Sequence, residues 1–123
     1  MNEINNIKLK RGDVYIADFR GLDCGLYGFV PAIIVQSDRV NPESSTTIVV
    51  PVFTLAEESP FCIPLKGAKL RRRSKALCDR IVCIDKYRLK NRLCRLDEEE
   101  LRKVTRTLKR TLAINPSPIY TSE

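Results

Sequence analysis

The chain contains no histidine among its 123 residues, and this absence restricts the chemistry open to it. Nucleophile pairs of serine or cysteine with histidine are excluded, and so is a ribonuclease that works with two imidazoles. Any hydrolytic or phosphoryl-transfer reaction must therefore use carboxylates, hydroxyls, lysine or arginine.

Metal-binding and membrane-spanning patterns are missing as well. The five cysteines form no Cys-x-x-Cys pair, so the common structural zinc patterns are absent, and we expect no cofactor. No apolar run approaches the roughly 20 residues that span a bilayer, and MNEINNIKLK at the N-terminus has no apolar signal region. We expect a cytoplasmic protein whose cysteines pack as small buried hydrophobes in a reducing compartment: Cys24, Cys62, Cys78, Cys83 and Cys94.

Positive charge is concentrated in the second half of the chain. Residues 1–60 carry a balance of −3, whereas residues 61–123 carry +10, which together give the net charge of +7. The segment from Leu65 to Lys75 contains three consecutive arginines, Arg71, Arg72 and Arg73. This distribution favours a polyanion such as RNA or DNA as the partner, although a merely solvated basic surface is the alternative.

About five short strands are predicted before any long helix. KRGDVYIADF alternates with period two, and PAIIVQSD and STTIVVPVFT are β-branched runs joined by an Asn-Pro turn, so they read as a hairpin. PFCIPL and ALCDRIVCID are the fourth and fifth strands. The glycine-rich GLDCGLYG is a loop. Pro51 lacks a backbone donor and predicts an edge or bulged position in the third strand.

A single amphipathic helix closes the predicted domain. Asp97 and Glu100 have the spacing of a capping box, three glutamates occupy the first turn, and Asn115 and Pro116 end the helix. One apolar stripe contains Leu101, Val104, Leu108 and Leu112. Short strands sealed by one helix predict a mainly β domain, as a small antiparallel barrel or curled sheet.

The order of these segments resembles the MazF/PemK family of toxins from type II toxin-antitoxin systems. The resemblance runs from about Lys10 to Ile114 and is most specific in RGDVYIADF, PAIIVQSD and IVCIDKYRL. It implies an N-terminal extension at 1–9, a domain at 10–114 and a tail at 115–123. It also implies an SH3-like barrel (MazF/CcdB-like), a homodimer, an antitoxin peptide as partner, and cleavage of single-stranded RNA without a metal to a 2′,3′-cyclic phosphate and a 5′-hydroxyl.

The catalytic pair that the family uses does not match this sequence. Well-studied members have an arginine directly before the proline of the second strand and a threonine near the end of the third. The matching residues here are Val30 and Phe53. Neither carries charge or donates a hydrogen bond, so the catalytic residues are unknown, and Thr54, Arg20 and Arg80 are the candidates, with Tyr27 and Arg39 as further possible donors.

Residues expected to contact RNA include polar positions that border the family's groove, two aromatic residues for base stacking, and the basic segment. They are Asp23, Tyr27, Phe29, Gln36, Ser37, Asp38, Asn41, Arg71, Arg72 and Arg73. The alternative function is a catalytically inactive module that binds nucleic acid or an antitoxin-like peptide. A third reading, a relative of the gyrase-poisoning toxins with this fold, depends on C-terminal helix residues that are not recognisable here.

Overall fold

The structure, a computed structural model, describes residues 8–54, 57–67 and 69–114. The predicted tail at 115–123 and residues 1–7 of the predicted extension lie outside these ranges. The strands are β1 (Asp13–Asp18), β2 (Phe29–Ile34), β3 (Thr46–Thr54), β4 (Cys62–Pro64), β5 (Ser74–Leu77), β6 (Val82–Asp85) and β7 (Leu89–Arg95). Helix α1 spans Glu98–Leu112, and two short 3₁₀ turns cover Asn41–Glu43 and Lys86–Arg88.

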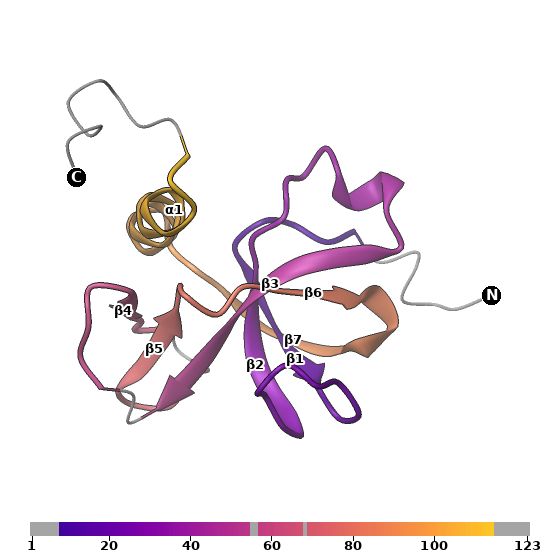
Figure 1. Cartoon of the computed structure of the whole chain (residues 1–123), viewed down its shortest axis with the longest axis horizontal. Coiled ribbons are helices and arrows are strands. Elements are labelled where there is room, and N and C mark those ends of the chain that lie inside the picture. The colour runs from indigo at the N-terminus through magenta and orange to yellow at the C-terminus, as the bar shows by residue number, and fades with distance from the viewer. Residues whose placement is uncertain (1–7, 55–56, 68, 115–123) are drawn as a thin grey trace.

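The strands form one antiparallel sheet in the order β4-β5-β3-β2-β1-β7, with β6 paired to the first half of β3. Figure 1 shows the sheet strongly twisted, with α1 lying across the β4–β5 end. The sheet is curled but not closed. The predicted class, mainly β with one C-terminal helix, is confirmed.

The sequence pattern located β1, β2, β3 and the short β4 correctly, but not the number of strands that follow β4. The predicted fifth strand is two strands, because a turn in which Arg80 N donates to Leu77 O separates β5 from β6. β7 was not predicted. Its exposed Lys90 and Arg92 give LKNRLCR a polar composition, which is typical of an edge strand that discourages pairing with another chain.

The sequence suggested an edge or bulged position for Pro51, but the structure does not place Pro51 at an edge of the sheet. Pro51 is fully buried in the central strand β3 and pairs with Ala32 of β2. On its other side β3 pairs with β6 over Thr46–Val49 and with β5 over Val52–Thr54. Pro51 therefore lies where β3 changes partner, at a position outside both of those ladders, and a missing N–H is tolerated there.

Two apolar clusters lie on opposite faces of the sheet. Tyr15, Ala17 and Phe19 of the first strand region enter one cluster, whereas Val14 enters the other, as the period-two pattern requires. The first cluster, which we call the loop-side core, includes Val30 and Leu26. The second, the helix-side core, packs against Val104 and Leu108 of α1.

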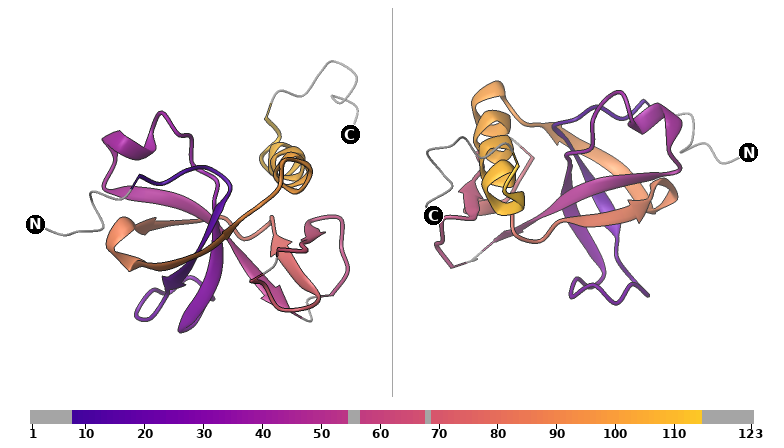
Figure 2. Two further views of the ribbon diagram at one scale, coloured as in Figure 1. Left: turned by 180° about the vertical axis from the view of Figure 1, so that it is seen from behind. Right: turned by 45° about the horizontal axis from the view of Figure 1, so that its top comes forward.

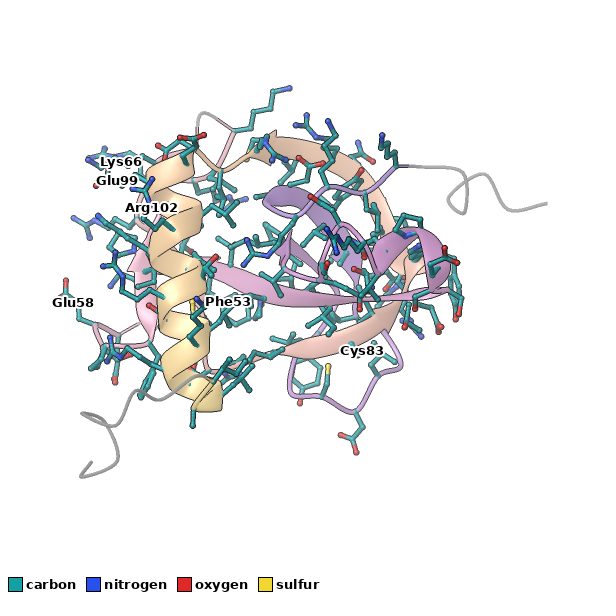
Figure 3. All side chains as sticks on the ribbon, turned by 90° about the horizontal axis from the view of Figure 1, so that it is seen from above. Phe53, Glu58, Lys66, Cys83, Glu99 and Arg102 are labelled. Atoms are coloured by element: carbon teal, nitrogen blue, oxygen red, sulfur yellow. The ribbon has the colours of Figure 1, made fainter. Side chains whose placement is uncertain are left out.

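Helix α1 begins as predicted and is pressed closely against the sheet. Asp97 and Glu100 form the reciprocal capping box. Glu100 also accepts a hydrogen bond from the backbone N of Lys66, at the helix end where Figure 3 labels Lys66 and Glu99. Gly12 has φ +99°, and a Cβ there would lie 2.9 Å from Leu101, so glycine allows this close approach. Leu112, predicted in the apolar stripe, is exposed because it is the last helical residue.

Within the described residues, no helix is long and apolar enough to cross a membrane.

Candidate functional site

The loop between β1 and β2 is anchored by apolar residues. Leu26 is fully buried in the loop-side core, and Leu22 and Cys24 pack against it. Phe19 N donates to Gly28 O at 2.8 Å, which closes the loop. Tyr27 and Phe29 are left outside with exposed fractions of 83% and 53%, so both predicted stacking residues are at the surface.

Val30 and Phe53 belong to the same apolar cluster beneath this loop. Val30 is 7% exposed, and Phe53 is half-buried against the loop-side core. Leu22 and Cys24 of the loop cover the same cluster. The structure thus places two apolar side chains in one cluster at these positions, and neither of them offers a hydrogen-bond donor.

Arg80 extends from the β5–β6 turn to the outside of the loop. Its Nη1 lies 3.9 Å from the position that a Cβ on Gly25 would occupy. Arg80 is exposed, and the ion pairs of the described residues do not include it. The guanidinium is therefore free to meet a phosphate that approaches the loop.

Arg20, another candidate, is held at the base of the loop by Asp18. Its Nε and Nη2 each donate to the Asp18 carboxylate at 2.9 Å, and its guanidinium lies 4.6 Å from the centre of the Phe29 ring. Arg88 Nη1 donates to the backbone oxygens of Asp18 and Arg20, while its buried Nε has no partner in the described chain. Arg20 is thus committed to an ion pair, unlike Arg80.

The Arg20 hydrogen bonds lower the pKa of Asp18 to about 2, from an ordinary 3.8. Because the folded-state pKa is depressed, the stabilising contribution of this pair is fully present above about pH 4 and is lost as the pH falls through about 2. We expect Arg20→Gln to return the Asp18 pKa toward 3.8, measured by NMR titration of the carboxyl carbon. An unchanged midpoint in the variant contradicts the pairing.

Thr54 does not share the surface of Phe53. The β3–β5 register runs without a shift through Val52, Phe53 and Thr54, so no bulge turns the Thr54 hydroxyl toward the loop-side core. Thr54 is exposed at the end of β3, opposite Ser74. Arg39 is exposed in a different turn, where its backbone N donates to Ser37 Oγ. Of the two arginine candidates at the loop, Arg20 is paired with Asp18, and Arg80 is in none of the ion pairs of the described residues.

Gln36 and Asn41 form a buried network. Gln36 Nε2 donates to Asn41 Oδ1 at 2.8 Å, and Asn41 Nδ2 donates to Gln36 O at 3.2 Å. Thr47 Oγ1 also donates to Asn41 Oδ1 at 2.8 Å, and Lys86 Nζ donates to Asn41 O. The side chains of Gln36 and Asn41 therefore hold the 36–47 connection in place.

The remaining predicted RNA contacts are exposed but dispersed. Asp23 lies in the loop, and Asp38 accepts a hydrogen bond from the backbone N of Arg11 at 2.7 Å. Ser37 is exposed beside Asp38. Arg71, Arg72 and Arg73 are exposed on the turn before β5, where Arg73 has φ 63° and Ser74 Oγ donates to Arg71 O at 2.6 Å.

The cysteines are all free in the structure, but not all are buried as expected. Cys78 is buried, and burial raises its pKa to about 12, so its thiol stays protonated. Cys83 is exposed, because it is on the outward side of β6. Among the described residues no group of three or more cysteine or acidic side chains could hold a metal ion.

Solved structures similar to this chain include a MazF and a mycobacterial endoribonuclease. The chain superposes on MazF from Deinococcus radiodurans with a TM-score of 0.77 at 19% identity, covering 88% of this chain and 99% of that one. A mycobacterial endoribonuclease in complex with its cognate antitoxin gives a TM-score of 0.75 at 23% identity, covering 89% and 99%. These matches confirm the expected MazF-like fold.

The sequence comparisons establish the family. The family described as PemK-like, MazF-like toxin of type II toxin-antitoxin system matches residues 10–112. Endoribonuclease EndoA of Bacillus subtilis (strain 168) is 33% identical over 111 residues, covering 86% of this chain and 96% of that relative. The chain therefore belongs to the PemK/MazF-like toxin family.

Sequence reasoning missed several charged residues near these surfaces. Arg88 was visible within IVCIDKYRL, but its bonds to Asp18 and Arg20 depend on a tertiary contact between residues about 70 positions apart. Arg11 was quoted only as part of KRGDVYIADF, although its side chain donates a hydrogen bond to Thr105 of helix α1. The sequence shows that Arg102 and Arg106 are spaced to lie on one face of the helix, but it does not show that Arg11 lies beside them.

Proposed function

We propose that this chain is the toxin of a toxin-antitoxin pair and that it cleaves single-stranded RNA by the metal-independent reaction of its family. The support is family membership over residues 10–112, together with a relative named as an endoribonuclease and a solved one bound to its cognate antitoxin. An antitoxin peptide and a second copy of the chain are the proposed protein partners, and the cytoplasm is the proposed place of action.

Cleavage on this proposal occurs at the loop between β1 and β2. The 2′-oxygen of the RNA forms a bond to phosphorus, and the bond from phosphorus to the 5′-oxygen breaks. The 2′-hydroxyl proton passes to water, and the leaving 5′-oxygen takes a proton from water, which gives a cyclic phosphate and a 5′-hydroxyl. Arg80 stabilises the negative charge on the non-bridging oxygens of the phosphorane, and Tyr27 and Phe29 stack on the flanking bases.

The exposed polar and basic residues extend this contact. Asp23, Ser37 and Asp38 border the strand's path, and Arg71 to Arg73 add sequence-independent attraction to phosphates. Gln36 and Asn41 act indirectly on this proposal, by holding the 36–47 connection.

The apolar side chains of Val30 and Phe53 lower the rate of RNA cleavage that we expect. A missing donor to the transition state costs about 2.7–4 kcal/mol, and Arg80 stands on a turn outside the apolar surface rather than within it. We therefore expect turnover well below that of relatives with both donors. The alternative, a catalytically inactive module, is supported by the same two residues, Val30 and Phe53. Membership of the family and the named relatives favour the endoribonuclease.

The test is to incubate the full chain with a long single-stranded RNA in EDTA and to map new 5′-hydroxyl ends. We expect cuts at defined sequences, and Arg80→Ala is expected to slow them about a hundred-fold or more. Arg110→Ala serves as the matched control, because Arg110 is also exposed but lies on α1, away from the loop. If the wild-type chain makes no cuts, the endoribonuclease proposal fails and the inactive module replaces it.

A further inference from the structure

A basic groove runs along helix α1, away from the loop between β1 and β2. Its volume is about 520 Å³, within the range of ligand sites in general. Figures 1 and 2 place α1 and the loop on different sides of the molecule. The lining residues are Arg11, Glu98, Leu101, Arg102, Thr105, Arg106 and Lys109.

The floor of the groove is a fixed arginine. Arg11 Nε donates to Val35 O at 3.1 Å, and Arg11 Nη2 donates to Thr105 Oγ1 at 2.6 Å. Thr105 Oγ1 donates its own proton to Leu101 O at 2.8 Å, so it is oriented to accept from Arg11. Gly12 lets Leu101 approach closely beside it, which holds this turn against the helix. The Arg11 guanidinium is thus pre-positioned at little further entropic cost.

The groove carries an excess of positive charge that the protein does not neutralise. Arg102, Arg106 and Lys109 project from one face of α1, and Arg102 is labelled on the helix in Figure 3. The ion pairs among the described residues involve none of these three nor the side chain of Arg11. Glu98 is the one acidic residue in the lining, so four cations face one carboxylate.

The lining suits a phosphodiester strand better than a peptide. From Arg102 to Arg106 the helix rises about 6 Å, and from Arg106 to Lys109 about 4.5 Å, so the cations form a row along the groove. Leu101 is the only apolar side chain in the lining, whereas a bound protein segment needs buried apolar or aromatic anchors. Phosphates need only cations and polar donors.

We propose that this groove binds the phosphodiester backbone of single-stranded RNA, as a second contact surface separate from the loop where cleavage occurs. The inference rests on the proposed action on RNA and extends it. The groove holds a part of the strand that is not being cut, and its attraction is independent of base sequence because none of its contacts reads a base edge.

The experiment measures the affinity for a 24-nucleotide 2′-O-methyl oligouridine, which cannot be cleaved because its 2′-oxygen is blocked. Fluorescence anisotropy is recorded from about 50 to 200 mM salt. We expect Arg102→Ala combined with Arg106→Ala to weaken binding at least about tenfold at the lower salt. The slope of log affinity against log salt should become shallower by about 0.7 for each lost phosphate contact. Both residues are exposed, so the fold should persist, and thermal melting checks this.

The matched control is Lys103→Ala combined with Arg110→Ala. It removes the same charge from the same helix, but neither residue lines the groove, and Lys103 is paired with Glu99 at 3.6 Å. Equal slope changes in the two double variants overturn the groove proposal while leaving the proposed action on RNA intact. Absence of any binding by the wild-type chain overturns the groove proposal, whereas the proposed action on RNA is decided separately by the cleavage assay. If the groove variant keeps its RNA affinity but loses affinity for an oligoglutamate peptide, the occupant is an acidic protein segment and the proposal is wrong.

Discussion

Replacing Val30 by arginine and Phe53 by threonine in one protein is expected to raise the rate of RNA cleavage at least about a thousand-fold. Each transition-state donor contributes about 10²–10³ to the rate of such reactions. Val30 and Phe53 pack against one cluster beneath the loop, so the two new polar groups would face the same phosphate. The aliphatic stem of an arginine at position 30 can lie against the apolar side chains of the loop-side core.

The measurement is the initial rate of appearance of 5′-hydroxyl ends in EDTA, for the double variant and for each single variant. Val30→Met combined with Phe53→Val is the control, because it changes side-chain shape at both positions without adding a donor. Thermal melting shows whether the loop-side core tolerates each change. A double variant no faster than this control contradicts the placement of the family's catalytic pair at these two residues, and so does a wild-type rate equal to that of relatives with both donors.

Replacing Asn41 by alanine is expected to lower the free energy of unfolding by about 3 kcal/mol. The Asn41 side chain accepts hydrogen bonds from Gln36 Nε2 and Thr47 Oγ1, and all three residues are buried. Its removal leaves two buried donors without that acceptor, and an unsatisfied buried group costs about 1–3 kcal/mol. The melting temperature should fall by roughly 10 °C in a domain of this size.

The Asn41→Ala variant also distinguishes a structural role for Asn41 from a direct contact with RNA. Urea denaturation gives the change in stability, and anisotropy with the blocked oligouridine at low temperature gives the RNA affinity of the folded variant. We expect the affinity to change less than about threefold. Ser45→Ala, at an exposed residue of the same connection, should alter neither quantity. Loss of affinity without loss of stability contradicts the structural role.

Local signals in the sequence predicted the parts of the fold that depend on local physics. The capping box at Asp97 and Glu100 needs only residues three apart, and β1 shows its two faces through strict alternation. The split between β5 and β6 was hidden, because the turn after Leu77 contains Cys78 and Asp79 but neither glycine nor proline. β7 was hidden by its charged, edge-strand composition.

The candidate site was less accessible from sequence, because its geometry depends on contacts between distant segments. The sequence does not show in which direction the side chain of an exposed arginine in a turn points. The approach of Arg80 to Gly25 and the ion pair of Arg20 with Asp18 could therefore be seen only in the structure. An amide residue can equally bind a ligand or satisfy its own backbone. Only the burial of Gln36 and Asn41 distinguishes the two uses.

The central strand β3 has a consequence for how the domain folds. Its nine residues pair with β2, β5 and β6, and they supply Val49 to the loop-side core and Val50 and Val52 to the helix-side core. Neither half of the sheet can be completed while this segment is unstructured. The two halves should therefore denature in one cooperative transition, and acquisition of the native state should be slow, because so many of its pairings join distant parts of the polypeptide.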